Sequence, residues 1–148
     1  MSSSEPIHDV MDRWFQHLRG ELSGGLDAIL HEDCVFLSPV VYSPQVGREI
    51  SKLYLSAAGA VLPGEEADGE PMTDDAHGAF RYTKKILQGH HAVLEFETTV
   101  GEIYVNGADI ITCDDEGWIT EFKVMMRPHK ALDVVKEQMM VMMEKLSS

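Results

Sequence analysis

A change in hydrophobic periodicity near residue 79 constrains the fold of this chain more than any other feature. Before it, apolar residues recur at spacings of three and four, as they do along one face of an amphipathic helix. After it, they follow the two-residue alternation that is typical of β-strands. Helices therefore come first and a meander of strands follows, without alternating βαβ units. This order predicts an α+β domain.

Three helices are expected in the first half of the chain. The apolar spacing predicts an amphipathic helix over residues 5–19, a short helix over 26–31 and a third helix over 48–62. A short strand over 34–37 is expected before the third helix. The buried face of that helix is expected to consist of Ile50, Leu53, Tyr54, Ala57, Ala58 and Val61.

Strands and one further helix are expected in the second half. The alternation predicts strands over residues 79–88, 90–100, 102–112 and 118–127. The pair Asn106 and Gly107 suggests a turn or a bulge inside the third of these strands. Residues 114–117 read as a hairpin turn, and a C-terminal helix rich in methionine is expected over 129–146 after Pro128.

Composition excludes several classes of function. The 148 residues hold 12 Lys and Arg against 25 Asp and Glu, a net charge of −13, which argues against nucleic-acid and anionic-membrane partners. The chain has no apolar run long enough to span a membrane, and its first ten residues do not resemble a secretion signal. We therefore expect a single domain over 1–148, located in the cytoplasm, with a mobile acidic loop over 63–78.

The cysteines and histidines show no metal-binding pattern. Cys34 and Cys113 lack a zinc-type partner and are expected to be buried thiols, and none of the seven histidines belongs to a metalloprotease motif. No phosphate-binding loop or dinucleotide fingerprint is present either. We expect neither a metal nor a cofactor.

Three short phrases together resemble a known superfamily. They are LDAILHEDCVF at 26–36, GREI at 47–50 and DDEGWITEF at 114–122. Their order and spacing resemble the NTF2-like superfamily, which includes SnoaL-like polyketide cyclases and ketosteroid isomerases. The resemblance covers nearly the whole chain up to Pro128. It implies a cone, in which N-terminal helices wrap a curved mixed or antiparallel sheet around an apolar pocket, and a homodimer formed through the outer sheet face.

The resemblance also implies positions for catalytic groups. Ser38 occupies the place of the isomerases' aspartate base, and a serine hydroxyl is not basic near neutral pH. Trp14 matches their oxyanion tyrosine, and Asp109 matches the protonated acid that donates to the oxyanion. Steroid isomerisation of the usual type is therefore not expected.

The SnoaL-like cyclases carry their acid on the strand of Asp109, so cyclase chemistry stays open. A dehydratase-type site would need a His and Asp pair with tyrosines, whose residue types are present without a diagnostic spacing.

Two interpretations of Asp109 remain open. It interrupts an apolar stretch of strand, where an ionised carboxylate needs a partner or a proton. It is either a general acid or base at the floor of the pocket, or a carboxylate paired with Arg81, Lys84 or Lys123 on the sheet.

The sequence therefore predicts a pocket for an apolar small molecule. Its expected ligand-binding residues are Trp14, Ser38, Tyr54, Phe96, Phe122, Val124 and Met126, with Asp109 as the catalytic candidate. One hypothesis is proton-transfer chemistry of the cyclase, isomerase or dehydratase type. The other is a non-catalytic ligand-binding or protein-interaction module.

Overall fold

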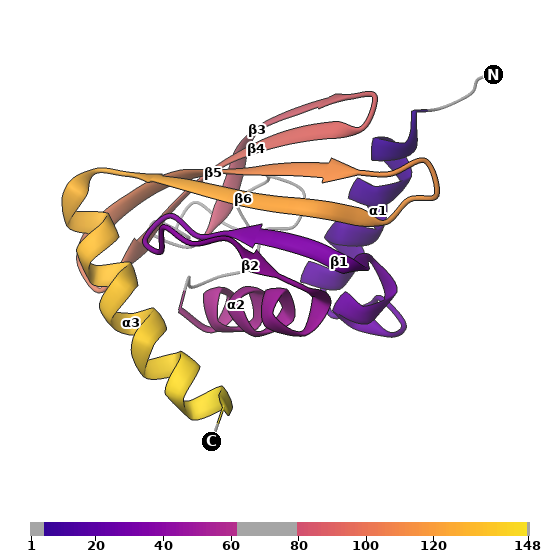
Figure 1. Ribbon diagram of the computed structural model, residues 1–148. Coiled ribbons are helices and arrows are strands. Elements are labelled where there is room, and N and C mark those ends of the chain that lie inside the picture. The colour runs from indigo at the N-terminus through magenta and orange to yellow at the C-terminus, as the bar shows by residue number, and fades with distance from the viewer. Residues whose placement is uncertain (1–4, 62–79, 148) are drawn as a thin grey trace.

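A computed structural model describes residues 5–61 and 80–147 of the chain (Figure 1). The expected acidic loop over 63–78 lies outside the described residues. In chain order, the elements are α1 (Pro6–Leu18), the 3₁₀ helix η1 (Gly25–Ala28), β1 (Leu30–Leu37), β2 (Gln45–Val46), α2 (Arg48–Val61), β3 (Arg81–Gln88), β4 (His91–Val100), β5 (Ile103–Cys113), β6 (Ile119–Arg127) and α3 (His129–Ser147). None of the described helices is long and apolar enough to cross a membrane.

The strands form one mixed, open sheet in the order β2-β1-β6-β5-β4-β3. All neighbours are antiparallel except β1 and β6, which run parallel. Figure 1 shows the sheet curving over α1 and α2, with α3 leaving the end of β6 and lying beside α2. The α+β class and the cone expected from the superfamily resemblance are therefore confirmed.

The prediction of a short helix over residues 26–31 is wrong in its second half. Only Gly25–Ala28 is helical, and β1 already begins at Leu30, four residues earlier than expected. Leu30 pairs with Ile119 of β6, and the amide of Ile119 donates to the carbonyl oxygen of Ile29 at 2.8 Å. Pairing with a distant strand thus overrides the local helical spacing.

The turn or bulge expected at Asn106 and Gly107 is also wrong. β5 passes through both residues and pairs with β4 in unbroken register. The glycine is there because a Cβ atom would lie 2.4 Å from Cζ of Phe96 and 2.7 Å from the carbonyl oxygen of Met125. Its absent side chain lets the Phe96 ring lie flat across β5.

The inner face of the sheet and the N-terminal helix form the hydrophobic core. Ile7, Val10, Met11 and Trp14 of α1 are buried against apolar residues of β4, β5 and β6. Both cysteines are free thiols and buried, as expected.

α2 buries a residue that the apolar stripe did not include. Its fully buried positions are Ser51 and Ala57, whereas Ile50 is only half-buried. The Ser51 hydroxyl donates to the carbonyl oxygen of Cys34 at 3.2 Å, and this hydrogen bond allows the polar side chain to face the core. The side chain of Val61 lies outside the described residues.

Candidate functional site

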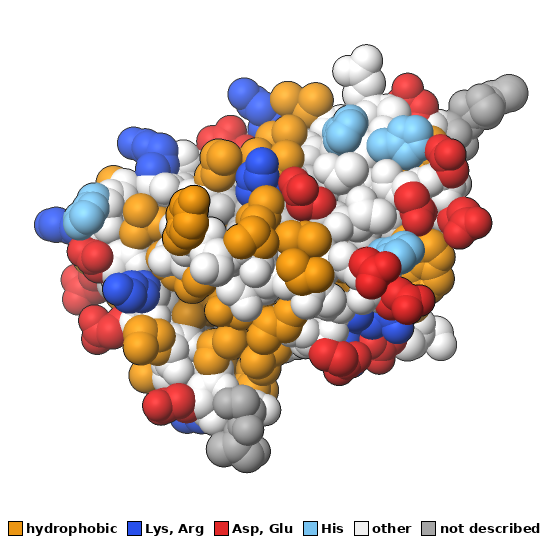
Figure 2. Space-filling model, viewed as in Figure 1, with side chains coloured by type: hydrophobic (Ala, Val, Ile, Leu, Met, Phe, Trp, Pro, Cys, Tyr) orange, Lys and Arg blue, Asp and Glu red, His pale blue; other side chains and the backbone are white. Residues whose placement is uncertain are grey.

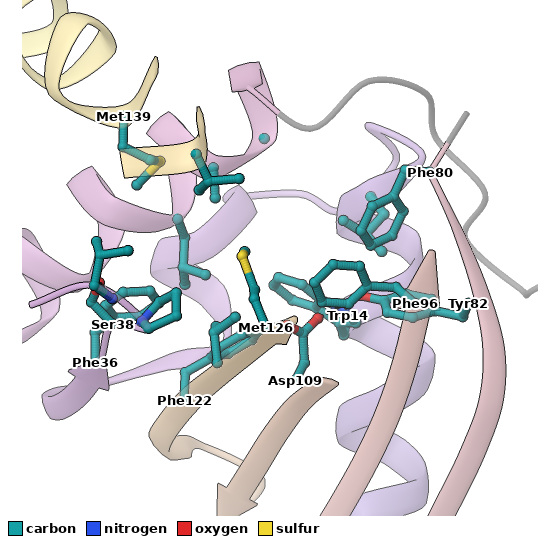
Figure 3. Close-up of a pocket in the computed structure, with 18 of the residues that line it drawn as sticks. Trp14, Phe36, Ser38, Phe80, Tyr82, Phe96, Asp109, Phe122, Met126 and Met139 are labelled. Carbon is teal, nitrogen blue, oxygen red and sulfur yellow. Dashed lines mark hydrogen bonds between the residues drawn. The ribbon is translucent and has the colours of Figure 1, made fainter. Parts of the chain in front are cut away.

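A cavity of about 230 Å³ lies between the inner face of the sheet and the three α-helices (Figure 3). The helices contribute Trp14, His17, Leu18, Leu55, Ala58, Gly59, Val135 and Met139. The strands, the segment after β1 and the residue before β3 contribute Phe36, Ser38, Pro39, Val40, Phe80, Tyr82, Phe96, Asp109, Phe122, Val124 and Met126. The lining is mostly apolar, which suits a largely apolar ligand.

Strand register explains why Asp109 faces this cavity. It lies directly between Leu94 of β4 and Val124 of β6, and cross-strand partners point to the same face of a sheet. The alternation along β6 likewise turns Phe122, Val124 and Met126 inward. Asp109 is therefore a carboxyl group on an apolar floor.

The surroundings of Asp109 favour its neutral form. Its side chain is 7% exposed, and burial raises the pKa of this carboxyl from 3.8 to about 7, while a hydrogen bond from Tyr82 acts in the opposite direction. The Tyr82 hydroxyl donates to Oδ2 at 2.9 Å. The alternative ion pair on the sheet is not observed, since Arg81 instead contacts Glu97 at 3.0 Å. Among the described residues, the hydrogen-bond partner of Asp109 is a tyrosine and not a cation.

Tyr82 is the central member of a hydrogen-bonded chain. The indole Nε1 of Trp14 donates to the Tyr82 oxygen at 3.1 Å, so the tyrosine's own proton is directed to Asp109 (Figure 3). Tyr82 is 2% exposed, and burial together with the nearby Asp109 charge raises its pKa well above the usual value. Its hydroxyl therefore stays protonated and serves as a fixed donor.

The structure places most of the sequence-predicted residues at this cavity. Trp14, Ser38, Phe96, Asp109, Phe122, Val124 and Met126 line it. Tyr54 does not line it; its ring stacks on the lining residue Phe36, with 5.2 Å between the ring centroids. Tyr54 therefore packs against a residue of the cavity wall without lining the cavity itself.

Ser38 lines the cavity but its oxygen is already engaged. The backbone amides of Val40 and Val41 donate to the Ser38 hydroxyl oxygen at 3.1 and 3.3 Å. Such bonds are typical of serine in a turn. Ser38 thus shapes the chain after β1.

Sequence reasoning missed two ionisable lining residues, Tyr82 and His17. Tyr82 pairs directly with Phe96 and is the one buried residue of β3. A register shift follows it and interrupts the alternation of buried and exposed residues along the strand. His17 follows Trp14 by three residues on α1, a spacing that puts both on one helix face. That spacing is the sequence signal that could have identified His17 as a lining residue. With Asp109, these two are the ionisable groups among the described lining residues.

Comparison with solved structures agrees with this architecture. A steroid delta-isomerase from Pseudomonas aeruginosa matches with a TM-score of 0.80 and 27% identity, covering 100% of this chain and 99% of the other. A protein with a cystatin-like fold from Silicibacter pomeroyi matches with a TM-score of 0.73 and 28% identity over 92% and 86% of the two chains. An NTF2-like protein from Mesorhizobium loti matches in fold, with a TM-score of 0.63 and 18% identity over 86% and 96%.

Searches against protein-family models and curated proteins found no match. The fold, its pocket and the structural relatives define an α+β cone with an apolar cavity. The chain has the fold of the NTF2-like superfamily.

Proposed function

We propose that this protein binds a compact, largely apolar molecule bearing a carbonyl group, and that Asp109 exchanges a proton with it. The reaction would be of the cyclase, isomerase or dehydratase type. The observation that carries the proposal is the one carboxyl group among the described lining residues, which is buried at the floor of a mostly apolar cavity. Burial of such a group is costly and is common where proton transfer is needed.

The hydrogen-bonded chain suits Asp109 to this task. With a pKa of about 7, its carboxyl group is present in both protonation states near neutral pH. Tyr82 holds Oδ2, which leaves the other oxygen for a ligand. The protonated form can donate to a carbonyl oxygen, and the ionised form can accept a proton from carbon. The likeness to a steroid delta-isomerase supports chemistry next to a carbonyl group.

A second candidate is a non-catalytic ligand-binding module. It is favoured by Ser38, because the superfamily resemblance puts a catalytic base at that position. The Ser38 oxygen accepts two backbone amide hydrogens and cannot serve as a base. In that case Asp109 would only orient a ligand.

Proton exchange separates the two candidates. We would measure binding of 2-tetralone, a bicyclic ketone, and the exchange of its α-hydrogens in D₂O by proton NMR. The wild type is expected to accelerate exchange, and Asp109→Leu to slow it by roughly 100-fold or more. Glu95→Gln, on the neighbouring strand, is the control and should match the wild type. Binding without exchange in the wild type would support the binding module, and exchange unchanged in Asp109→Leu would refute the proposal.

We also propose that the outer face of the sheet forms a homodimer. Ile86, Val93 and Ile110 make a cross-strand row there, and Ile86 and Met125 are 53% and 55% exposed. Figure 2 shows hydrophobic side chains gathered among charged ones over β5 and β6. Met125→Lys should shift a dimer to monomer in analytical ultracentrifugation, whereas Glu137→Lys should not. A monomeric wild type would contradict this proposal.

The free thiols bear on location. Cys34 and Cys113 are both buried and form no disulfide, an arrangement that is usual in cytoplasmic proteins. We propose that location for the protein.

A further inference from the structure

Asp109 is buried without a positively charged partner among the described residues. The hydrogen bond that it receives comes from the Tyr82 hydroxyl, which donates to Oδ2 at 2.9 Å. Within residues 5–61 and 80–147, no side chain or amide donates to the other oxygen, Oδ1. A buried carboxylate in a protein is normally paired with a cation or neutralised by a proton. One oxygen of this carboxyl group is therefore left for a ligand.

The hydrogen-bonded chain that reaches Asp109 runs in one direction. The indole nitrogen of Trp14 can only donate, and it donates to the Tyr82 oxygen at 3.1 Å, so the tyrosine proton is directed to the carboxyl group. A hydrogen bond of this kind favours the ionised carboxylate and lowers the pKa of Asp109, whereas burial has the larger effect and raises it to about 7. Above neutral pH, the cavity floor therefore carries a negative charge.

Aromatic rings extend from this chain along the cavity wall (Figure 3). The Tyr82 ring meets Phe80 edge-on at 5.1 Å between centroids, and Phe80 stacks on Phe96 at 4.9 Å. On the other side, the Trp14 ring lies 5.1 Å from that of Phe122. The π-face of an aromatic ring attracts a cation. A wall of such rings beside a carboxylate is therefore complementary to an organic ammonium ion.

The other charges of the molecule also favour a cationic ligand. The described lining residues include neither Lys nor Arg, so no fixed positive charge there repels an ammonium group or attracts a carboxylate or phosphate. Burial lowers the pKa of the lining residue His17 from 6.5 and raises that of Tyr82, so both are uncharged just above neutral pH. The net charge of the whole chain is −13, which attracts cations and repels anions.

We propose that the cavity binds a compact, apolar amine as its ammonium ion, with Asp109 as the counter-ion. The ammonium N–H groups would donate to the carboxylate oxygen that Tyr82 leaves open. The hydrocarbon part would fill the apolar remainder of the cavity of about 230 Å³, which suits a primary or secondary amine on a small cyclic hydrocarbon. This inference concerns a second class of ligand for the cavity and is independent of proton exchange with a ketone.

Binding of 2-aminotetralin to the full chain, measured by isothermal titration calorimetry slightly above neutral pH, tests the proposal. The wild type is expected to bind it in a one-to-one complex and more tightly than 2-tetralol, an uncharged alcohol on the same hydrocarbon. Asp109→Asn removes the charge and keeps the shape. It should lose about 100-fold in affinity for the amine and bind 2-tetralol about as tightly as the wild type does.

A matched control separates the cavity from the acidic surface. Glu95→Gln removes one carboxylate from the neighbouring strand, on the outer face of the sheet, and should bind 2-aminotetralin as the wild type does. Equal losses in Glu95→Gln and Asp109→Asn would show that the amine only responds to the net charge, and the inference would be overturned. Circular dichroism establishes that each variant is folded.

The pH dependence of binding is a second readout, which does not depend on any variant. The complex needs an ionised Asp109 and a protonated amine, whose pKa is about 10 as in lysine. The affinity should therefore rise about tenfold per pH unit up to about pH 7, then level off, and fall above about pH 10. The affinity for 2-tetralol should not rise over this range.

The groups around Asp109 allow this profile to be assigned. Its neighbours on β4 and β6 are Leu94 and Val124, and the lining residues of α2 and α3 are uncharged, so the remaining titratable lining groups are Tyr82 and His17. Loss of a proton from His17 would also strengthen amine binding. A rise that persists in Asp109→Asn would therefore belong to His17 and would overturn the role of Asp109.

The outcomes distinguish this inference from the proposed function. A flat profile between about pH 5 and 8 in the wild type, or equal affinities for the amine and the alcohol, would overturn the amine site. Exchange of 2-tetralone in D₂O would be unaffected by that result, and the proposed function would stand. If the amine binds as expected and the wild type does not accelerate exchange, the amine site stands and the proposed proton exchange is wrong.

Discussion

The two faces of the sheet each carry a carboxylate that accepts a hydrogen bond from a tyrosine. On the inner face, Tyr82 donates to Asp109 at 2.9 Å. On the outer face, Tyr104 donates to Glu97 at 3.0 Å, and Arg81 also contacts that carboxylate at 3.0 Å. The same pair of residue types therefore occurs twice, once buried at the floor of a mostly apolar cavity and once beside solvent and a cation.

The comparison shows that environment, more than residue type, decides what such a pair can do. The outer carboxylate has its charge balanced by Arg81 and is open to solvent, so the contact is a surface ion pair worth little free energy. The inner carboxyl lacks a described cation and is desolvated, which raises its pKa to about 7. The inner carboxyl group therefore titrates near neutral pH.

The largest expected effect is the difference in stability loss between truncating a side chain on the inner face of the sheet and truncating its neighbour on the outer face. Phe122 is buried, and Phe122→Ala should lower the free energy of unfolding by about 3–5 kcal/mol because it leaves a cavity. Its neighbour Lys123 faces outward, and Lys123→Ala should change stability by no more than about 0.5 kcal/mol. Urea unfolding measures both, and equal losses would remove the distinction between the faces.

The next effect is a pH dependence of stability that originates on the inner face. Asp109 has a higher pKa in the folded protein than its ordinary 3.8, so it binds its proton more tightly when folded. Its contribution is fully present below about pH 4 and is lost as the pH rises through about 7. Relative to Asp109→Asn, the wild type should lose on the order of 3 kcal/mol over this window. Urea unfolding between pH 4 and 8 would show it, and a constant difference between the two proteins would contradict it.

A smaller effect is expected from removing each tyrosine hydroxyl. Tyr82→Phe leaves the Trp14 N–H and a buried carboxyl without their partner and should cost about 1–3 kcal/mol. It should also raise the pKa of Asp109 further, because the tyrosine hydrogen bond lowers it. Tyr104→Phe, on the half-exposed outer pair, should cost about 0.5 kcal/mol or less. Thermal unfolding tests both, and similar costs would show that burial does not separate the pairs.

The smallest effects concern two glycines, one in a crowded position and one with open space around it. Gly107→Ala would push a methyl group into the Phe96 ring and the Met125 carbonyl, and should cost about 1–2 kcal/mol. Gly59 lies inside α2 with nothing within 4 Å of a built Cβ, so Gly59→Ala should add about 0.5–1 kcal/mol of stability. Differential scanning calorimetry would give shifts of opposite sign, and shifts of the same sign would contradict the packing around Gly107.

Local patterns in the sequence determined much of the fold but little of the chemistry. The change of period near residue 79 predicted the order of elements, because helices and strands bury their apolar residues at different spacings. The local patterns gave wrong predictions at residues 29–31 and at Gly107, because contacts with residues distant in sequence determine the backbone conformation there. Asp109 stood out because a carboxyl group in an apolar strand is rare.

The other ionisable residues that line the cavity could not be predicted in the same way. Tyr82 reaches it through strand pairing and a register shift at the start of β3, neither of which leaves a local sequence pattern. His17 is a polar residue at the edge of an apolar helix stripe, a place where most histidines are solvated. Its place on the cavity wall depends on which face of α1 the sheet covers.

The parallel pairing of β1 with β6 has a consequence for how the cavity comes into being. Leu30 pairs with Ile119, so β1 cannot be completed until nearly the whole chain has been synthesised. α1, which is buried against β5 and carries Trp14 and His17, depends on the same late strands. Such non-local contacts are characteristic of slowly folding domains. A nascent chain stalled before β6 would therefore expose its first helix and lack the cavity, so the site exists only once β6 has been synthesised.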